Sequence, residues 1–592
     1  MDKRRALIWN YFNIQSNQST HAKCNVSSCQ QAIKRGQNPS SYSTTPLVNH
    51  LRSKHRNLFE QYEAALSQPG TSIVQNLPAN QPSILSAFED VRVWPHDNSK
   101  ARKITRKVAE MIALDVQPIS IVEDSGFKEL LTTIEPRYCL PSRPYIRNEI
   151  DLLFTEVKTK MKELIAGEFI SVTTDIWTSQ VNNMCFLSLT CCFVNTDYVR
   201  KVLVLNTSPF PGTHSGVNIA EKLQNLVNDW EIPVGKIFFC VSDNASNMKN
   251  AITTFGVKWA GCSAHTIQLC VNDAITSQRV ITDALKVCRK IIGHFSHSAQ
   301  ACEKLRQVQD QLGMSHKKLI QDVSVRWNST LRMIERMIDQ KAAVTLYSAD
   351  NNVDQLSSNQ WSILDKVVKI LKPCEQFTLD VSADTSSLSL IVPGYSLLRS
   401  HLLNLGDDHG VQTFKASLIE ALDKRFNYYT LDPYICLASF LDPRFKDKYI
   451  SPVVLDQIKD ILGETPDIEV ITPEANSAPR EQSSCNFWLA EEDVTPATPS
   501  TVSHLDSEIS EYSSLPRSNM ALKDPVCYWK SETRFPALKN WAKQVLSAPA
   551  SSVRSERVFS TSGNVLSEKR NRLNSNFSEI LVLLHDNLPL LK

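Results

Sequence analysis

Two cysteines and two histidines near the start of the chain restrict how its first 62 residues can fold. They form the pairs Cys24-x4-Cys29 and His50-x4-His55, which twenty residues separate. Two thiolates and two imidazoles make up the ligand set of a tetrahedral zinc ion. The segment is too short and too polar to fold by burying a core, so metal binding has to supply its folding free energy. We predict a structural zinc site, because four protein ligands leave no position for water. The alternative is that two incidental cysteines and two surface histidines fall here by chance.

The charged residues are distributed unevenly, although the formal net charge of the chain is only +2. Residues 1–60 hold nine Lys or Arg and two Asp or Glu, whereas residues 464–517 hold two Lys or Arg and eleven Asp or Glu. The basic start favours contacts with phosphates. The acidic stretch also contains six prolines, and its composition predicts a disordered insert over residues 464–520. Within it, Phe487-Trp488-Leu489 is a candidate for docking on a partner.

The distribution of apolar residues argues against membrane and secreted proteins. The longest apolar run, around Cys185–Val194, carries Ser and Thr and has the length of a strand, well below the roughly 18 residues of a membrane helix. The amino terminus lacks the apolar stretch and the small-residue cleavage site of a signal peptide. The 15 cysteines, an odd number, favour reduced thiols plus one metal site over a disulfide framework. We expect an intracellular protein without a membrane segment.

Helical periodicity dominates two long parts of the chain. Residues 100–165 begin with a basic helix face that meets either phosphates or solvent. The lysines on that face are Lys100, Lys103 and Lys107. Residues 263–463 are mostly helical in period and contain few glycines. Two more helices are expected over 537–546 and 578–588, the second ended by Pro589.

Four strands and one helix are expected between residues 166 and 262. Runs rich in β-branched and aromatic residues predict the strands, and apolar residues at helical spacing predict the helix. In chain order they are strands 169–174, 185–194 and 199–206, helix 216–230 and strand 237–241. This order is that of an RNase H-like core, although many other α/β folds give similar strings.

Asp175 and Asp243 follow the first and the fourth of these strands. Carboxylates at the ends of neighbouring strands can converge on one point, where they hold Mg²⁺ and leave room for water and phosphate. An aspartate at the end of a strand more often caps a turn or a helix. The strand pattern therefore makes both residues candidates for a metal site without deciding between the two roles.

The surroundings of the four zinc ligands resemble the BED-type zinc finger. Trp9, Tyr11 and Phe12 precede the first ligand pair, and the second pair lies in TTPLVNHLRSKH. The first Cys–Cys gap is longer than in the commonest BED pattern. The resemblance implies binding to double-stranded DNA with the histidine-bearing helix facing the duplex, through salt-dependent phosphate contacts and some readout of guanine edges. The basic residues available for this are Lys34, Arg35, Arg52 and Lys54.

Five further motifs occur in the order found in hAT-superfamily transposases. They are TTDIWTS with Asp175, SDNASNM with Asp243, CSAH (Cys262 to His265), VRWNS (Val325 to Ser329) and SSVRSERVFSTSGNVLSEKRNRL (Ser551 to Leu573). The resemblance covers nearly the whole chain except the linker and the acidic insert. It implies a multidomain α+β protein, in which a small zinc finger precedes an RNase H-like α/β catalytic core interrupted by a large all-helical insertion.

The same resemblance implies a mechanism and its residues. Asp175, Asp243 and Glu556 would hold two catalytic Mg²⁺ ions, which serve to cut and join DNA at transposon ends without a covalent enzyme intermediate. Trp327 would hold an unstacked base outside the duplex, next to Arg326 for phosphate. Cys262 and His265 would support the active site, with zinc binding by this pair as the alternative. The residues assigned to DNA contact or support are Trp327, Arg326, His265 and Cys262.

The resemblance also divides the chain into seven segments. They are a BED-type zinc finger (1–62), a flexible linker (63–99), a helical entry or DNA-binding region (100–165), the first part of the RNase H-like core (166–262), a helical insertion domain (263–463), the acidic disordered insert (464–520) and a hAT C-terminal dimerisation region that completes the core (521–592). The last segment implies a homodimer or a higher homo-oligomer, although core packing alone also accounts for its apolar residues.

Three functions follow from this reading. The first is an active hAT-type DDE transposase in the nucleus, favoured because all three acidic positions are filled. The second is a domesticated BED zinc-finger transcriptional regulator that binds DNA and dimerises but no longer cuts. The third, an RNase H-type nuclease acting on RNA–DNA hybrids, does not explain the finger, VRWNS or the carboxy-terminal motif.

Overall fold

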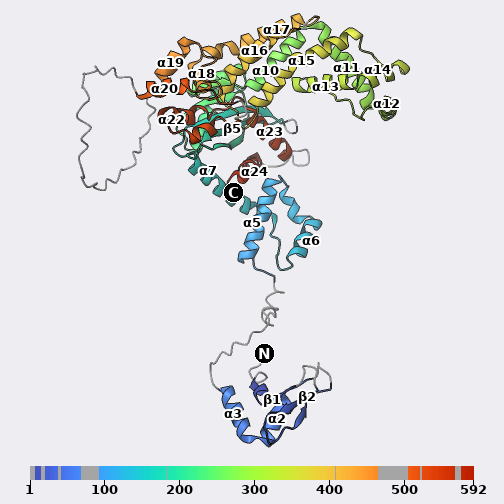
Figure 1. The fold of residues 1–592 in the computed structure, drawn as a ribbon, viewed down its shortest axis with the longest axis vertical. Helices are drawn as coiled ribbons and strands as arrows, with labels where there is room; N and C mark the ends of the chain where they lie inside the picture. Colours follow the sequence, from blue (N-terminus) through green and yellow to red (C-terminus); the bar gives the residue numbers. More distant parts are fainter. Residues whose placement is uncertain are drawn as a thin grey trace, which may run out of the picture. The chain divides into compact units, whose positions relative to one another are not determined.

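A computed structural model describes residues 7–14, 20–37, 42–67, 93–179, 181, 183–406, 409–463, 504–519, 523–566 and 575–591. The chain forms two compact units, Met1–Arg92 and Val93–Lys592, which we call the amino-terminal unit and the large unit (Figure 1). Each has its own hydrophobic core. Among the helices in the described ranges, none combines the length and the apolar character needed to cross a lipid bilayer.

The amino-terminal unit is a three-stranded antiparallel sheet, in the order β1-β2-β3, with two helices. Phe12, Leu47 and Leu51 are buried in its small core. Its elements are η1 (Ile8–Asn10), β1 (Phe12–Asn13), β2 (His21–Cys24), β3 (Ala32–Lys34), α2 (Thr45–Lys54) and α3 (Arg56–Ser67). The predicted linker is too long at both ends, because α3 continues to Ser67 and the next helix begins at Ser99. Residues 68–92 of that linker lie outside the described residues.

The large unit contains one five-stranded sheet in the order β6-β5-β4-β7-β8. Three strands form an antiparallel meander, and β7 and β8 extend the sheet in parallel with β4. The strands are β4 (Ile170–Thr178), β5 (Cys185–Val194), β6 (Arg200–Pro209), β7 (Ile237–Ser242) and β8 (Lys258–Gly261). β8 was not predicted, and β4 is longer than predicted. Asp175 therefore lies within β4, paired with Ser188 of β5, and not after the strand. Because aspartate is rare in strands, the sequence pattern placed the end too early.

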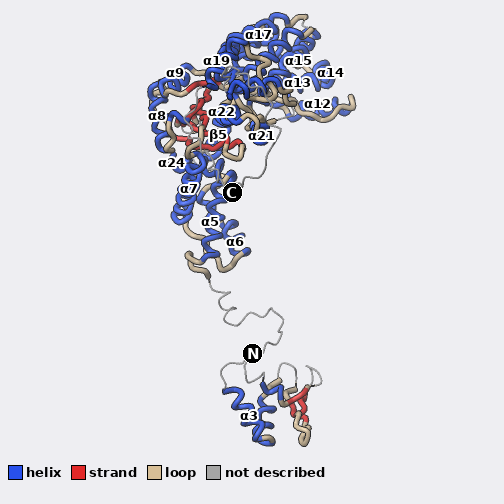
Figure 2. Tube along the Cα trace, turned by 60° about the vertical axis from the view of Figure 1, so that its left-hand side comes forward, coloured by secondary structure: helices blue, strands red, loops and turns tan. Residues whose placement is uncertain are grey.

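Helices flank this sheet, with α8 and α9 on one side and α22 on the other (Figure 2). The helices before and between the strands are α5 (Ser99–Leu114), η3 (Ile119–Glu123), α6 (Ser125–Ile134), α7 (Arg143–Ile165), α8 (Gly216–Asp229), η4 (Val234–Lys236) and α9 (Ser246–Phe255). On α5, Lys107 pairs with Glu110 (Nζ–Oε2, 2.8 Å) and Arg106 pairs with Glu156. Part of the basic face predicted here is thus neutralised within the unit.

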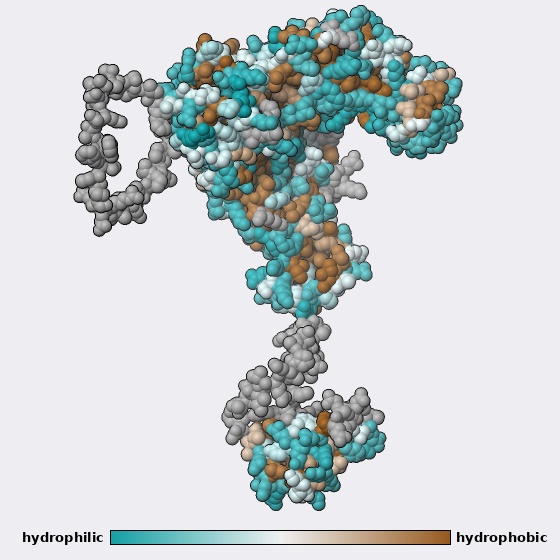
Figure 3. Space-filling model, in the orientation of Figure 1, coloured by the Kyte–Doolittle hydropathy of each residue, from teal (hydrophilic) through white to brown (hydrophobic). Residues whose placement is uncertain are grey.

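One helix of the large unit leaves its apolar side uncovered. α6 buries none of its residues, and Leu130 and Ile134 are 55% and 71% exposed. Figure 3 shows apolar side chains on the surface over α5 and α6. A contiguous exposed apolar surface usually marks a contact with another molecule.

After β8 the chain forms helices from Ser263 to Gly463, as the periodicity predicts. Their apolar faces merge into one core, in which Trp327, Phe414 and Leu437 are buried. A capping box of Ser357 and Gln360 starts the longest of them. The helices are α10 (Ser263–Thr276), α11 (Arg279–His297), α12 (Ala299–Gln311), α13 (Trp327–Asp339), α14 (Lys341–Asp350), α15 (Ser358–Val381), η5 (Leu388–Leu390), α16 (Ile391–Asn404), α17 (Gln412–Phe426), η6 (Asn427–Leu431), α18 (Pro433–Phe440) and α19 (Pro452–Gly463).

Part of the acidic stretch predicted to be disordered is an ordered helix, α20 (His504–Ser514). Tyr512 is fully buried in the core. The buried ammonium of Lys446 donates to the backbone oxygens of Tyr512 (2.6 Å) and Leu515 (2.8 Å) near the end of α20. The prediction was wrong here because it averaged composition over a long stretch, whereas the apolar residues of α20 are enough to anchor one short helix. Residues 464–503, with Phe487-Trp488-Leu489, lie outside the described residues.

We expect Glu508→Ala to destabilise the large unit by about 1–3 kcal/mol. The Glu508 carboxylate is buried and accepts the backbone N–H groups of Ala537 and Leu538 (both 3.1 Å to Oε2) in the first turn of α22 (Pro536–Val545). These N–H groups have no partner within α22, and a negative charge is favourable at the start of a helix. Urea denaturation of the full chain measures the change.

The control for this prediction is Glu511→Ala on the same helix. The Glu511 side chain is more than half exposed and only loosely paired with Arg534 (3.9 Å), so its loss should cost less than about 0.5 kcal/mol. Equal destabilisation by the two variants would contradict the capping role of Glu508.

The carboxy-terminal helices return to the sheet. They are α21 (Val526–Ser531), α22, α23 (Val553–Val565), α24 (Ser575–Asn587) and η8 (Leu588–Leu590). Both helices predicted here are present, and Pro589 lies in η8 just after α24. Where a bulge interrupts β6, the buried amide of Asn587 donates to the oxygen of Val204 (2.8 Å) and accepts the Val204 N–H (2.9 Å). Asn587 thereby attaches α24 to the sheet. The basic run at residues 569–572 lies outside the described residues.

Candidate functional site

Four metal-ligating side chains converge in the amino-terminal unit. Cys24 ends β2, Cys29 lies in the following turn, His50 lies on α2 and His55 directly follows that helix. The Sγ of Cys24 is 3.6 Å from Nε2 of His55, and the Sγ of Cys29 is 3.5 Å from Nε2 of His50. All four ligand atoms lie within 4.8 Å of one another. Tetrahedral coordination at ordinary zinc bond lengths separates sulfur from nitrogen by roughly 3.6 Å. These residues therefore fit a structural zinc ion, as predicted.

The zinc ligands are supported by the core of the unit. Phe12 packs edge-on against the His50 ring, with the centroids 5.8 Å apart. Burial lowers the pKa of His50, with smaller contributions from His55 and Lys54. The neutral imidazole that metal binding requires is thus favoured before the metal arrives.

Three of the four basic residues predicted to face DNA are available for contact. They are exposed and form no ion pair with any residue that the structure describes: Lys34, Arg52 and Lys54. Arg52 also lies over one ring, that of Phe59 (4.8 Å), but its side chain stays exposed. Arg35 differs, since its guanidinium lies between the rings of Trp9 (5.0 Å) and Tyr42 (4.5 Å). This position assigns Arg35 to the packing of the finger instead of an open DNA surface.

In the large unit, alternate residues of β4 hold a distant segment of the chain. Ser171 Oγ lies 3.0 Å from Ser547 Oγ, and Thr173 Oγ1 lies 2.8 Å from Ser555 Oγ. The last two residues are 382 positions apart. Small hydroxyl side chains let the two segments approach closely. Because successive strand residues alternate between faces, Asp175 projects from the same face, and Glu556 on α23 is brought to its neighbourhood.

Negative charges gather around Asp175. Burial, together with the nearby charges of Asp243 and Glu556, raises the pKa of Asp175 to about 7, against a lowering by the backbone N–H of Ile176, which donates to Oδ1 at 2.8 Å. Asp243 follows β7 as predicted, and its Oδ1 accepts the N–H of Ala245 (3.2 Å). The resulting like-charge repulsion is what a bound cation relieves.

Two basic side chains also act on Glu556. Its side chain is accessible to solvent, yet the protein atoms around the carboxyl raise its pKa, while Arg326 and His265 lower it. His265 lies in the first turn of α10, and Arg326 immediately precedes α13. The structure thus brings both predicted support residues close to the carboxylates.

Cys262 supports this arrangement from the interior. It is fully buried, and its Sγ accepts the backbone N–H of Ser552 (3.3 Å) at the start of α23. The N–H of Ser263 also donates to the oxygen of Ala550 (3.1 Å). These contacts fix the segment that carries Glu556 and favour a supporting role over zinc binding by Cys262 and His265.

The structure contradicts the predicted role of Trp327 as a surface for an unstacked base. Its side chain is only 1% exposed, within the core of the helical part. Its backbone N–H donates to Oε1 of Gln268 on α10 (3.0 Å). A base has no access to this ring, and Trp327 instead anchors the start of α13 and so positions Arg326.

Asp243 and Glu556 are near enough to Asp175 to raise its pKa, but the oxygens of the three carboxylates are not close enough together to share one ion. Among the described residues, the finger ligands are the one set of three or more Cys, His, Asp and Glu side chains placed to share a metal. A two-metal site distributes its carboxylates over two ions about 3.5–4 Å apart. Oxygen donors of this kind are those that Mg²⁺ prefers. The three carboxylates are therefore donors of the kind that suits Mg²⁺. In this arrangement they are too far apart to share one ion.

The prediction missed Trp177. It lies two residues after Asp175 on the same face of β4 and stacks on Phe559 of α23, with ring centroids 5.7 Å apart and planes at 21°. The signal was present in TTDIWTS, because strand positions i and i+2 share a face. Trp177 thus fixes α23 over the strand next to the carboxylates.

Comparison with known families agrees with this organisation. The BED zinc finger matches residues 6–56, the ZBED1 RNase-like domain 173–259, the ZBED1 RNase-like helical domain 260–370 and the hAT family C-terminal dimerisation region 504–588. The last match includes α20, which the sequence analysis had assigned to the disordered insert.

Similar proteins span nearly the whole chain. Zinc finger BED domain-containing protein 4 of Homo sapiens is 30% identical over all of this chain, which spans 52% of that protein. Zinc finger BED domain-containing protein 6 of Mus musculus is 25% identical over 99% of this chain and 70% of its own length. A Zea mays protein whose name refers to the AC transposase is 23% identical over 81% of this chain and 64% of its own length. The chain belongs to the hAT-related proteins that carry a BED zinc finger.

Proposed function

We propose that this protein is a hAT-type transposase that cuts and joins DNA at transposon ends by two-metal phosphoryl transfer. The observation that carries the proposal is the approach of Asp175, Asp243 and Glu556 from β4, from the end of β7 and from α23, which raises the pKa of Asp175. The strand order β6-β5-β4-β7-β8, with three antiparallel strands followed by two parallel ones, supports an RNase H-like core split by the helices of 263–463.

The side chains have distinct tasks in such a reaction. Asp175, Asp243 and Glu556 would hold Mg²⁺, which activates the attacking hydroxyl and stabilises the leaving oxygen at phosphorus. The guanidinium of Arg326 binds phosphodiester oxygens through charge-assisted hydrogen bonds. His265, which also lowers the pKa of Glu556, offers a further hydrogen-bond donor.

The amino-terminal unit supplies DNA binding in this proposal. Lys34, Arg52 and Lys54 form an exposed basic set on a zinc-stabilised finger, suited to phosphate contacts on duplex DNA. The hAT dimerisation region supports a homodimer or a higher homo-oligomer, and DNA as substrate places the protein in the nucleus.

A second candidate is a domesticated DNA-binding regulator that no longer cuts. The matches to the BED zinc finger and to the hAT dimerisation region support this function, because neither DNA binding nor dimerisation requires cleavage. Such a protein would keep the finger and the dimerisation region and lose only the reaction at phosphorus.

Excision from a plasmid separates the two functions. We expect the wild-type chain with Mg²⁺ to excise an element flanked by candidate terminal inverted repeats, and Asp243→Asn and Glu556→Gln to leave it in place. Asp197→Asn, at an exposed carboxylate in the turn between β5 and β6, is the matched control and should excise normally. Absence of excision with every candidate terminal sequence, together with intact DNA binding, would establish the regulator.

A further inference from the structure

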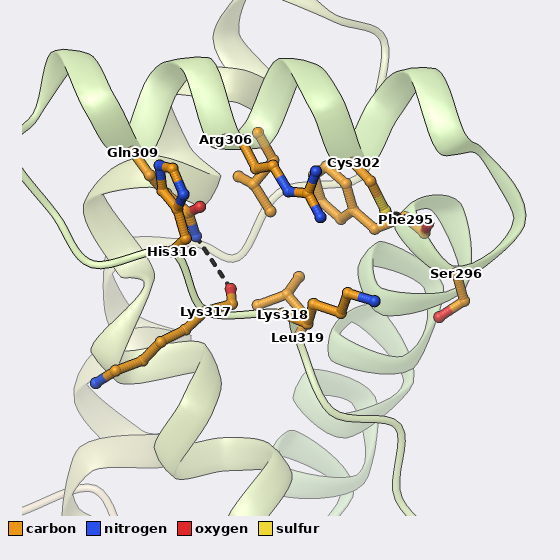
Figure 4. A pocket seen from close by; sticks show the side chains of 10 residues that line it. Phe295, Ser296, Cys302, Arg306, Gln309, His316, Lys317, Lys318 and Leu319 are labelled. Atoms are coloured by element: carbon orange, nitrogen blue, oxygen red, sulfur yellow. Dashed lines mark hydrogen bonds between the residues drawn. The ribbon is translucent and has the colours of Figure 1, made fainter.

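A pocket of about 380 Å³ lies in the helical part of the large unit, outside the residues assigned to the carboxylate site. It is enclosed by the end of α11, one side of α12 and the loop that follows α12 (Figure 4). The lining residues that matter for its chemistry are Phe295, Ser296, Cys302, Leu305, Arg306 and Lys318. Its volume is within the range of roughly 300–1,000 Å³ that small-molecule sites occupy.

Two positive charges face each other across the pocket. Figure 4 shows the guanidinium of Arg306 and the ammonium of Lys318 pointing into the same space from α12 and from the loop. Lys318 forms no ion pair with any residue in the described ranges. Arg306 contacts Glu303 at 3.2 Å, but both side chains are more than half exposed, so this pair is worth less than about 1 kcal/mol. An anion that enters the pocket can therefore replace Glu303 as the partner of the Arg306 guanidinium.

Phe295, Leu305 and Leu319 form the apolar part of the lining, beside the polar side chains of Ser296, Gln309 and His316. Phe295 and Leu305 are almost fully buried and close the pocket toward the helical core. The Sγ of Cys302 donates to the backbone oxygen of Phe295 (3.0 Å), so it adds no free polar group. An anion with a flat or apolar portion matches this combination better than an inorganic ion does.

The loop that carries Lys318 is held in place. Nε2 of Gln309 donates to the backbone oxygen of Lys317 (3.0 Å, dashed in Figure 4), and Nη1 of Arg336 donates to that of Lys318 (2.5 Å). His316 Nε2 lies 2.7 Å from Oδ1 of Asp310. Because the loop is already ordered, its backbone loses little conformational entropy when a ligand binds, which favours affinity.

The same loop leads from the pocket to Arg326 at the carboxylate site. Asp322 is buried, pairs with Arg289 (Nη2–Oδ2, 2.7 Å) and accepts the hydroxyl of Thr330 (2.9 Å). The N–H of Val323 donates to Oγ of Ser329 (2.9 Å). The pocket and Arg326 thus lie at the two ends of one anchored segment.

We propose that this pocket binds a nucleoside phosphate, with the phosphate between Arg306 and Lys318 and the base or sugar against Phe295 and Leu305. Guanidinium and ammonium groups are the usual phosphate donors in proteins. The ligand is either a free nucleotide or one nucleotide of a DNA strand, and the anchored connection to Arg326 favours the strand. The preference for a DNA strand over a free nucleotide rests on the proposed function, whereas the binding of a nucleoside phosphate does not.

Binding to the full zinc-loaded chain without Mg²⁺ tests the proposal. The probes are deoxyadenosine monophosphate, a fluorescein-labelled single-stranded oligonucleotide and inorganic phosphate. We expect the double variant Arg306→Ala/Lys318→Ala to raise the dissociation constant of the nucleotide probes about tenfold or more. Arg279→Ala/Lys286→Ala, on an exposed part of α11 that does not line the pocket, should leave it unchanged. Ser296→Trp should weaken the nucleotide probes more than inorganic phosphate, because it fills space and keeps the charges.

Alkylation of cysteines locates the bound probe. Nucleotide should protect Cys302, measured by peptide mass spectrometry, while the exposed Cys139 and Cys527 react as before. The proposal is overturned if no nucleotide probe binds, if the two double variants bind alike, or if Cys302 stays reactive. Binding of the free nucleotide alone, or of the strand alone, identifies the source. None of these measurements requires cleavage, so a failure of the transposase proposal leaves their outcome unaffected.

Discussion

For the proposed transposase, we expect Asp175→Asn to reduce Mg²⁺-dependent DNA cleavage by on the order of 10³-fold, because a metal ligand contributes several kcal/mol to the stabilisation of the transition state. The same substitution will stabilise the protein when no divalent ion is present. The pKa of Asp175 is raised from 3.8 to about 7, so the folded state holds a proton that the unfolded state has lost. The cost of ionising Asp175 therefore develops as the pH rises from about 4 to about 7 and is complete above it. A shift of about three pKa units corresponds to on the order of 4 kcal/mol.

Urea denaturation at two pH values measures this effect. At pH 8 without metal, Asp175→Asn should be more stable than the wild type, and near pH 4 the two should be equal. Addition of Mg²⁺ should stabilise the wild type more than the variant, because a neutral amide oxygen is a weaker ligand than a carboxylate. The control is Asp197→Asn, whose carboxylate is exposed. A stability difference that does not change with pH would show that the pKa of Asp175 is not raised in the folded protein.

Removal of zinc will unfold the amino-terminal unit and abolish its contribution to DNA binding. Structural zinc supplies roughly 10–16 kcal/mol to domains of this kind, far more than the small core around Phe12, Leu47 and Leu51. We expect Cys24→Ser to lose the ion and to weaken binding to duplex DNA about 100-fold or more. Fluorescence anisotropy with labelled duplex DNA and zinc analysis of the purified full chain provide the measurements.

The matched control for the finger is Cys139→Ser, which removes an exposed thiol from the large unit. It should keep its zinc and bind DNA like the wild type. Chelation of the wild type should reproduce the Cys24→Ser result, and the large unit should keep its own unfolding transition because it forms a separate compact unit. Duplex binding that survives the loss of zinc would place the DNA contacts outside the finger.

Most of the helices and strands could be predicted from local sequence patterns. β5 has the predicted bounds Cys185–Val194, because a continuous apolar run of strand length between polar turns allows little else. The zinc ligands were identified for a similar reason, since four donor side chains in two close pairs have few other uses. α20 escaped detection because its anchoring depends on Lys446 and on the start of α22, which lie far from it in the chain.

Contacts between residues far apart in the chain could be predicted only from the resemblance to a known family, and some could not be predicted at all. The approach of Glu556 to Asp175 depends on hydroxyl pairs such as Thr173 with Ser555. The local sequence around Thr173 or Ser555 does not predict that these two side chains meet. The burial of Trp327 depends on how α13 packs against α10, so an expectation carried over from other proteins was wrong for its ring. Trp177 was within reach of a periodicity argument, because it shares a strand face with Asp175.

The docking of α23 on β4 also sets an order of assembly in time. A ribosome that adds roughly 5–20 residues per second needs roughly 20–80 s to proceed from Asp175 to Glu556. From the synthesis of Asp243 onward, the emerging sheet carries two of the three candidate carboxylates and lacks the third. A nascent chain, or one whose synthesis stops before α23, therefore has no complete set, and any cutting of DNA is postponed until almost the whole protein has been made.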